Sequence, residues 1–204
     1  MQLYYAPGSI SVVVAIALHE AGLEFEPVRL DFPAGEQTKP AYHRINPKGR
    51  VPALVTGSGT LTETGAILDY IAATRPEAGL VPLEPFAAGK MREAMYYLAS
   101  TMHVNHAHKM RGYRWADRQE SFDDMTGKVR ETMAASAAHV EEYMLQSPFV
   151  LGESFSLADP YLFVVSTWLA GDGVDTSVFP KLTAFMDKME NRDSVMAVRA
   201  QGIL

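Results

Sequence analysis

The sequence predicts two domains of different class, an α/β domain followed by an all-helical domain. Short strand-like and helical runs alternate over residues 2–74. Three prolines then interrupt the pattern within residues 75–85, and beyond them apolar side chains recur every three or four residues, as on one face of a helix. The proline-rich stretch at residues 75–85 suits a semi-rigid linker. We therefore expect domains at residues 1–76 and 86–204, joined by a linker at 77–85.

The first domain opens with a predicted β-α-β unit. Residues 2–5 are a short strand-like run, and residues 12–21 form an apolar helix that ends at Gly22, since glycine commonly follows the last helical residue. Residues 25–30 alternate between apolar and polar side chains, which is the pattern of a strand with one buried face. We expect residues 31–50, which are rich in Pro, Gly and Lys, to be irregular.

Two strands and a helix are predicted for the rest of this domain. An apolar run at 53–56 is followed by the turn Gly57-Ser58-Gly59, a short strand near residues 60–61 and a helix from about 64 to 74. A β-α-β unit followed by β-β-α is the order of a thioredoxin-like domain. The predicted fold is therefore an α/β thioredoxin-like N-terminal domain plus an all-α helical bundle.

Methionines carry much of the helical periodicity of the second domain. Because Met fills irregular interiors well, we interpret these residues as core packing rather than as a ligand surface. The repeating residues are Met91, Met95, Leu98 and Met102, and then Met125, Val129, Met133, Val140 and Met144.

A further helix start is predicted at Ser156. Ser156 as N-cap and Asp159 three residues later form a capping box, with Asp in place of the usual Glu or Gln. The helix that follows is apolar on nearly every side, so we expect it to run through the middle of the second domain. This pattern indicates a folding role for Asp159 rather than a catalytic one.

Composition and charge exclude several classes of protein. The formal net charge is −6 and the basic residues are scattered, which argues against nucleic-acid binding. The absence of cysteine excludes disulfides, thiolate metal sites and protein-borne thiol chemistry. No apolar run approaches the roughly 18–20 residues of a membrane helix, and the N-terminus does not have the pattern of a signal peptide. We expect a cytoplasmic protein with no membrane association.

Pro52 marks a candidate ligand site at the start of the 53–56 strand. Proline cannot donate to a strand ladder, so the backbone of Val51 is left to pair with something else, and an extended ligand is one candidate. If the Val51–Pro52 bond is cis, the Val51 amide and carbonyl turn outward together. The alternative is an ordinary trans proline in a loop.

Glu63 and Thr64 mark a second part of the same candidate site. They precede a helix whose first-turn N–H groups favour an anion, so a ligand carboxylate is expected there beside the Thr64 hydroxyl. Glu63 would then hold an ammonium group of the same ligand. The alternative is that Thr62 or Thr64 simply caps the helix.

Four segments carry a resemblance to a known family. They are LYYAPGSIS at residues 3–11, NPKGRVPAL at 46–54, LTET at 61–64 and SLAD at 156–159. In this order and spacing they resemble the cytosolic glutathione S-transferases, most closely the bacterial beta class, over nearly the whole chain. The resemblance implies a homodimeric enzyme that uses glutathione as co-substrate.

Glutathione transfer requires a thiolate, and a free thiol with a pKa of about 8.5 is mostly protonated at neutral pH. A hydroxyl or N–H group at a helix N-terminus lowers that pKa. Beta-class enzymes carry a cysteine where this chain has Ile10, which has no group to donate. Ser9 aligns with the serine of serine-type classes and is the first candidate for the thiolate donor, with Ser11 second and Tyr5 or Tyr4 third. The alternative is that both serines only cap the first helix.

The segment at residues 98–103 is similar to the beta-class segment whose histidine faces the glutathione site, which implies roles for Ser100 and His103. Tyr96, Ser100 and His103 share one helical face by four-and-three spacing. The family usually has a lysine after this histidine, where this chain has Val104.

Three nearby histidines, His103, His106 and His108, also suggest a metal site. We reject this interpretation because only the first two align and no carboxylate accompanies them. Exposed histidines, or histidines stacked on aromatic residues such as Tyr113 and Trp115, are the alternative.

Together these observations predict a homodimeric, cytosolic glutathione transferase that conjugates glutathione to small apolar electrophiles without a metal, with the thiolate held by a serine hydroxyl. The electrophile is expected near Tyr96, Met102 and His103. Two alternatives are a glutathione-dependent isomerase, dehalogenase or peroxidase, and a non-catalytic transferase-like binding module, which Ile10 favours. The predicted glutathione-binding residues are Tyr5, Val51, Pro52, Glu63, Thr64, Ser100 and His103.

Overall fold

The computed structural model describes residues 1–204, which group into two compact units. The first unit consists of Met1–Pro82 and Glu190–Leu204, and the second of Leu83–Met189. The C-terminal segment thus joins the first unit, although the sequence placed it in the second domain. The predicted domain limits stay a prediction, because a unit grouped by contacts need not coincide with a domain.

Side-chain and backbone contacts hold the C-terminal segment in the first unit. Both Nε and Nη2 of Arg192 donate to the Glu20 carboxylate, at 2.5 and 2.8 Å, and the Ser194 hydroxyl donates to the same carboxylate at 2.5 Å. The N–H of Gly8 donates to the carbonyl of Ile203 at 3.2 Å. These partners lie far apart in the sequence, so no local pattern predicts them.

The sheet of the first unit has four strands in the order β2-β1-β3-β4. The strands are β1 (Gln2–Tyr5), β2 (Glu26–Arg29), β3 (Ala53–Thr56) and β4 (Gly59–Thr62). β1 pairs in parallel with β2 and antiparallel with β3, and β3 pairs antiparallel with β4. The predicted β-α-β and β-β-α units are both present, and the thioredoxin-like fold is confirmed.

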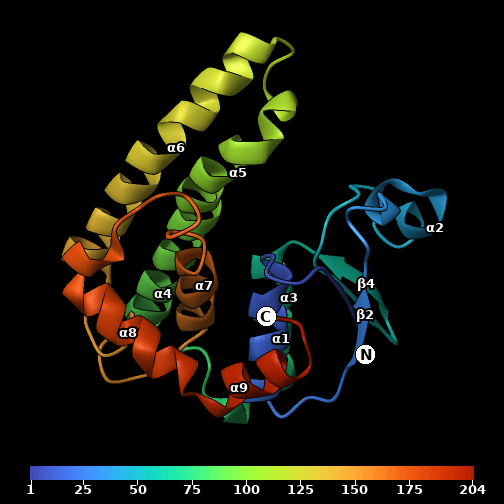
Figure 1. The fold of residues 1–204 in the computed structure, drawn as a ribbon. Coiled ribbons are helices and arrows are strands. Elements are labelled where there is room, and N and C mark those ends of the chain that lie inside the picture. The colour runs from blue at the N-terminus through green and yellow to red at the C-terminus, as the bar shows by residue number, and fades with distance from the viewer. The chain divides into compact units, whose positions relative to one another are not determined.

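Helices α1 (Ser11–Glu20), α3 (Thr64–Thr74) and α9 (Asp193–Ala200) belong to this unit, and α1 contacts both α3 and α9 (Figure 1). The sequence missed α2 (Pro40–His43) and a 3₁₀ turn at Glu36–Thr38, which lie in the stretch expected to be irregular. Pro40 suits the first position of a helix. Tyr42 of α2 is buried against Tyr4, and this tertiary contact stabilises a helix too short to form alone.

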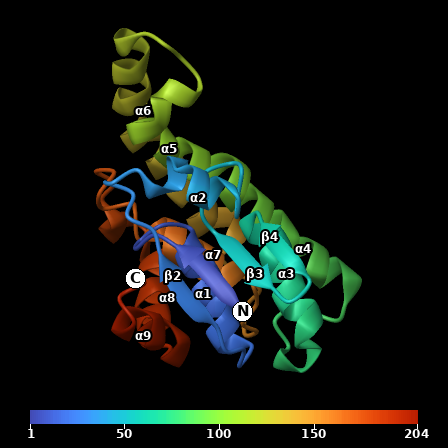
Figure 2. The ribbon, with the colours of Figure 1, turned by 90° about the vertical axis from the view of Figure 1, so that its right-hand side faces the viewer.

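The regular elements of the second unit are all helices, apart from isolated β-bridges within residues 149–154. Its helices are α4 (Pro85–Tyr97), α5 (His103–Arg111), α6 (Gln119–His139), α7 (Ala158–Ser166) and α8 (Pro180–Glu190). α5 and α6 lie side by side, and a π-helical turn at Leu98–Met102 joins α4 to α5 (Figure 2). A second π-helical turn, Val140–Met144, extends α6. No helix of the chain is both long enough and apolar enough to span a membrane.

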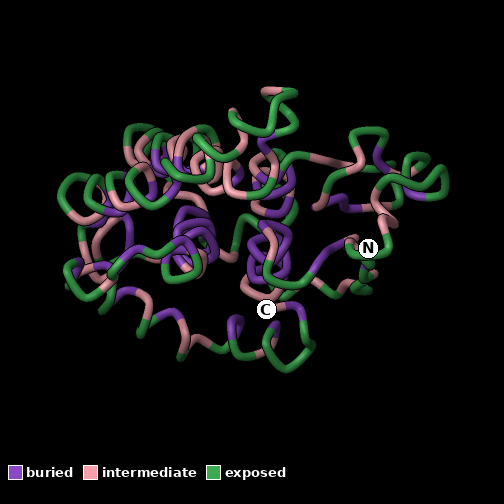
Figure 3. The backbone as a smooth tube through the Cα atoms, turned by 45° about the horizontal axis from the view of Figure 1, so that its top comes forward, coloured by how far each residue is buried: buried purple, intermediate pink, exposed green.

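The core of the second unit confirms two predictions. Every residue of α7 is buried, as expected of its apolar composition, and Figure 3 shows such buried segments along the inner helices. The Met pattern is core packing: only Met125 and Met144 of its members are partly exposed, and the buried members are Met91, Met95, Leu98, Met102, Val129, Met133 and Val140.

Ser156 and Asp159 are hydrogen-bonded to each other as the predicted capping box requires, but the residue before α7 is Leu157 and not Ser156. The Ser156 N–H donates to Oδ2 of Asp159 at 2.7 Å, and the Ser156 hydroxyl accepts from the N–H of Ala158 at 3.4 Å. Oδ1 of Asp159 accepts in addition from the N–H of Val150 at 2.8 Å, a contact that the sequence did not predict. Asp159 therefore fixes the preceding loop as well as the helix start.

Candidate functional site

The predicted residues of the first unit meet at one end of its sheet. Tyr4 pairs with Ala53 and Ala53 with Thr62. The last residues of β1 and β4 and the first residues of β3 therefore lie at the same end of the strands. The loop at residues 6–11, the Val51–Pro52 peptide and the start of α3 are therefore neighbours. A hollow of about 550 Å³ lies at the opposite end of the strands, lined by Met1, Phe25 and Val55 among others, and holds none of the predicted residues.

Ser9 lies in the loop before α1 and is half-buried. Its hydroxyl donates to the carbonyl of Ala6 at 2.8 Å and lies 2.7 Å from the hydroxyl oxygen of Ser11. Its oxygen also accepts from the N–H of Ser11 at 3.3 Å. The residue before α1 is Ile10, however, and no side chain caps that helix, so the alternative that the serines only cap it is wrong. The contact with the Ser11 N–H uses a lone pair of the Ser9 oxygen and leaves the hydroxyl proton available for donation.

Ser11 differs from Ser9 because solvent does not reach it. Its oxygen accepts from the N–H of Ala6 at 3.2 Å, and its hydroxyl lies 3.3 Å from the carbonyl of the same residue. In this conformation Ser11 holds the loop in place and has no free face for a ligand. Ile10, between the two serines, is buried as well.

The two tyrosines of β1 point to opposite faces of the sheet. Tyr5 is 6% exposed on the same face as Leu3. Tyr4 packs on Tyr42, with ring centroids 5.6 Å apart, in a cluster that also includes Val51. Neither tyrosine presents an open ring to solvent.

The Val51–Pro52 peptide bond is cis. The carbonyl of Arg50, just before it, accepts from the Tyr42 hydroxyl at 2.7 Å and from Nδ2 of Asn46 at 2.6 Å. Burial raises the pKa of Tyr42 to about 12, so this hydroxyl stays a donor at neutral pH. None of the backbone hydrogen bonds of this loop uses the N–H or carbonyl of Val51.

Glu63 has a backbone conformation that non-glycine residues rarely adopt, with φ of 69° and ψ of 121°. It is the residue before α3, and no side chain caps that helix, so the alternative cap by Thr62 or Thr64 is wrong. Thr64 is 8% exposed at the first position of the helix. Outliers of this kind cluster at ligand sites, where the surrounding structure maintains them.

Lys48 contacts the candidate site, which the sequence interpretation did not predict. Its ammonium donates to the Thr62 hydroxyl at 2.7 Å and forms an ion pair with Glu63. The two side chains of the pair are 42% and 70% exposed. Its place in the NPKG segment was the available signal, but nothing in the sequence shows that the segment reaches the start of α3.

Ser100 and His103 belong to the helical unit. Ser100 is exposed, and its hydroxyl donates to the carbonyl of Tyr96 at 2.8 Å. The π-helical turn at 98–102 interrupts the α-helical spacing that placed Tyr96, Ser100 and His103 on one face. Met102 is fully buried, so it does not line a surface for the electrophile, which corrects the prediction.

The histidines of α5 stack on aromatic rings. His108 packs edge-on against Trp115 with centroids 4.6 Å apart, as expected, whereas His103 and His106 pack on Trp168 at 5.0 and 4.4 Å. The expectation that no carboxylate accompanies them was wrong, because a turn after α7 brings a carboxylate to His106. No group of three or more His, Asp or Glu is arranged to hold a metal ion.

Comparison with known proteins identifies the family. A model described as the glutathione S-transferase N-terminal domain matches residues 1–73, and the model of the C-terminal domain matches residues 101–193. A solved structure of a glutathione transferase homolog from Sulfitobacter, with bound glutathione, is 64% identical, covers 100% of this chain and 98% of its own, and superposes with a TM-score of 0.98.

Two further relatives match over the full length of both chains. Glutathione S-transferase GstA of Escherichia coli O157:H7 is 30% identical over 207 residues, 100% of each chain. The beta-class glutathione S-transferase of Sphingomonas chungbukensis is 31% identical, with 100% of both chains covered and a TM-score of 0.86. The resemblance carried by the four sequence segments is confirmed, and the chain belongs to the glutathione S-transferase family.

Proposed function

We propose that the chain is a glutathione transferase in which the Ser9 hydroxyl donates to the glutathione thiolate and the second substrate is a small apolar electrophile. The single observation that carries this proposal is the position of Ser9. It is half-buried at the end of the sheet where Val51 and Glu63 also lie. Glutathione bound to a relative 64% identical supports the same ligand here.

Ser9 can redirect its hydroxyl hydrogen bond from the Ala6 carbonyl to a ligand sulfur at little cost. The carbonyl of Ala6, which now accepts it, also accepts from the Ser9 N–H at 3.2 Å and has the Ser11 hydroxyl 3.3 Å away. When the Ser9 hydroxyl turns to a ligand, the Ala6 carbonyl still has other donors. No buried acceptor is left without a partner, so the large cost of an unsatisfied buried group is avoided. A donor at the start of α1 also gains from the helix dipole.

The γ-glutamyl end of glutathione fits the start of α3. Its carboxylate would accept from the uncapped N–H groups and the Thr64 hydroxyl, and its ammonium would bind Glu63. The exposed ion pair of Lys48 with Glu63 contributes at most about 1 kcal/mol, so a zwitterionic ligand can separate it and engage both charges. The cysteinyl backbone would pair with Val51 beside Pro52.

The remaining predicted residues have less direct roles in binding glutathione. Tyr5 is buried at the end of β1, and Ser100 and His103 remain proposed glutathione-binding residues. The active form would be a cytoplasmic homodimer, which sedimentation of the purified protein tests.

Calorimetric titration with reduced glutathione is the decisive experiment. Saturable binding of one glutathione per subunit, lost in Glu63→Gln and retained in the exposed control Glu77→Gln, would support the site. An absence of heat at millimolar glutathione would refute the proposal and leave a binding module. Turnover of an activated aryl chloride by the parent protein, with loss in Ser9→Ala, tests the catalytic part.

A further inference from the structure

Three large apolar side chains are exposed together where α5 turns into α6. Met110 is 82% exposed, Tyr113 64% and Trp115 49%. Residues 110–118, which we call the tip, contain the end of α5 and the connection to α6. Figures 1 and 2 both show this end of the helix pair extending beyond α7 and α8. The tip is therefore a projection of the helical unit that the other helices of that unit do not cover.

The backbone of the tip is tightly held. Gly112 begins a 3₁₀ turn, and its carbonyl accepts from the N–H of Trp115 at 2.9 Å and from the N–H of Ala116 at 3.1 Å. A Cβ atom added at Gly112 would lie 3.0 Å from Cδ1 of Phe122, so the turn packs directly on the first helical turn of α6. Tyr113 and Trp115 therefore project from a fixed backbone rather than from a loose loop.

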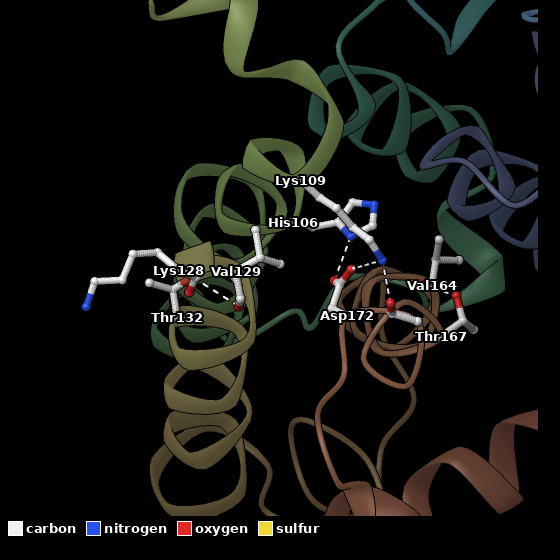
Figure 4. Close-up of polar contacts among 9 residues, drawn as sticks. His106, Lys109, Lys128, Val129, Thr132, Val164, Thr167 and Asp172 are labelled. Atoms are coloured by element: carbon white, nitrogen blue, oxygen red, sulfur yellow. Dashed lines mark hydrogen bonds and ion pairs between the residues drawn. The ribbon is translucent and has the colours of Figure 1, made fainter. Parts of the chain in front are cut away.

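The base of the tip is anchored by the residue that precedes it. The Lys109 ammonium lies 3.1 Å from Oδ1 of the buried Asp172 and also donates to the carbonyl of Gly171 (Figure 4). Nδ1 of His106 lies 2.7 Å from the other oxygen of the same carboxylate. These contacts join the end of α5 to the turn after α7, and they engage the charge of Lys109 inside the helical unit.

Two arginines of the tip present their charges to solvent. Arg114 and Arg118 are both exposed, and neither forms an ion pair. Cζ of Arg114 lies 6.0 Å from the ring centroid of Tyr113, a cation–π distance, so this cation lies beside exposed aromatic surface. The tip has three arginines and one acidic residue, Asp117, and thus a net charge of +2, whereas the whole chain carries −6.

The acidic residues at the start of α6 leave the helix on other sides. Phe122 is the residue of α6 that packs on the tip. Glu120 and Asp124 are each two positions from Phe122, which is about 160° around a helix. Asp123 accepts from Nε2 of Gln119 at 2.8 Å. Positive charge and apolar surface therefore coincide on the tip, and the carboxylates of α6 lie around the helix from it.

We propose that the tip binds the surface of a membrane that contains anionic phospholipids. Tyr and Trp favour the boundary between headgroups and acyl chains, Arg pairs with phosphate, and Met110 adds apolar area. A projection suits the soft, nearly flat surface of a bilayer, whereas a bound peptide needs a groove or a free strand edge. The expectation of no membrane association rested on the absence of a spanning segment, which surface binding does not require. The proposal does not depend on the glutathione site.

Sedimentation of the full chain with vesicles tests the proposal. We would compare vesicles of phosphatidylcholine alone with vesicles that contain equal parts of phosphatidylcholine and phosphatidylglycerol. Salt would be about 0.01 M or about 1 M, at which charges are screened over about 30 Å and about 3 Å. The chain should sediment with the anionic vesicles at low salt, be released at high salt, and bind phosphatidylcholine vesicles about 30-fold more weakly.

Paired arginine variants measure the contribution of charge. Arg114→Gln combined with Arg118→Gln should lower the partition coefficient about 30-fold, because each basic residue near an anionic surface contributes about a factor of five. Arg29→Gln combined with Arg44→Gln is the matched control, since both are exposed arginines of the first unit and the change in net charge is the same. At about 0.1 M salt, where charges beyond about 10 Å are screened, the control should change the coefficient by at most about two-fold.

Aromatic variants locate the contact. Tyr113→Ser should weaken vesicle binding, whereas Tyr143→Ser should not, although Tyr143 is 69% exposed elsewhere on the helical unit. The chain has two tryptophans, so Trp168→Phe leaves Trp115 as the only one. Its emission should shift to shorter wavelength with anionic vesicles, and Trp115→Phe, which retains Trp168, should show no shift.

Several results would overturn the proposal. They are no sedimentation of the parent chain with anionic vesicles at low salt, equal losses in the two arginine pairs, and unchanged emission of Trp115. Binding to polyglutamate without binding to vesicles would also overturn it, and would indicate an acidic protein as the partner of the tip. Thermal midpoints by circular dichroism verify that each variant is folded, and the result with the parent chain decides the matter even where a variant unfolds.

Discussion

The hydroxyl oxygens of Ser9 and Ser11 lie 2.7 Å apart, yet only Ser9 has any solvent exposure. Two serines that look equivalent in the sequence thus have different environments. Ser9 is half-buried and reached by solvent, whereas Ser11 is enclosed by the backbone of Ala6.

Substituting each serine by alanine should therefore produce opposite phenotypes. Ser9→Ala is expected to lower kcat by about ten-fold or more with little change in the thermal midpoint, because a thiolate donor is lost. Ser11→Ala should destabilise the fold by roughly 1–3 kcal/mol, since the Ala6 N–H loses its buried acceptor. Urea unfolding and aryl chloride turnover measure the two effects, and full activity in Ser9→Ala would move the donor role elsewhere.

The positive φ of Glu63 predicts a difference between two variants that both remove its carboxylate. The free energy of unfolding of Glu63→Gly should exceed that of Glu63→Ala by about 1 kcal/mol, because only glycine adopts this conformation without strain. Glu63→Gly should therefore unfold at a higher temperature. Both variants should bind glutathione more weakly than the parent in calorimetry. Equal thermal midpoints would show that the backbone relaxes in the alanine variant and stores no strain.

The capping box predicts unequal costs for its two members. Ser156→Ala should lower the free energy of unfolding by about 1 kcal/mol, the usual cost of a lost hydrogen bond at a helix start. Asp159→Ala should cost roughly 2–4 kcal/mol, because it also leaves the N–H of Val150 buried without an acceptor. Asp175→Ala is the control, since Asp175 caps a short 3₁₀ turn in an exposed position. Equal values for Ser156→Ala and Asp159→Ala in urea unfolding would contradict the second role of Asp159.

Burial of Tyr42 predicts a loss of stability in alkaline solution. The pKa of Tyr42 rises from 10.0 to about 12, chiefly by desolvation, so the folded protein keeps this proton after the unfolded chain has lost it. The unfolded state then binds fewer protons, and the free energy of unfolding falls as the pH rises from about 10 to 12; below pH 10 the contribution is fully present. Tyr42→Phe should show a smaller fall over that range in thermal unfolding followed by circular dichroism. An identical slope would assign the fall to other groups.

Hydrophobic periodicity, together with glycines and prolines at the ends of elements, predicted most of the fold. The bounds of β3 and α3 match the predicted residues. Prolines and glycines interrupt regular structure, so those near an apolar run mark where the element begins and ends. The helix α2 was not predictable in this way, since Tyr42 gains its burial from Tyr4 and not from its own neighbours in the chain. The π-helical turn before His103 was equally hidden, because its residues have ordinary helical propensity.

The sequence by itself determined the family, the two classes of element and the core methionines, since each depends on local spacing or on motifs that are read along the chain. Only the tertiary structure decided that Ser11 is enclosed while Ser9 is not, that Lys48 reaches Glu63, and that Asp172 orients His106. Those relations join residues brought together by pairing of strands and packing of helices. Burial and hydrogen-bond geometry arise from such long-range contacts, and a linear pattern does not encode them.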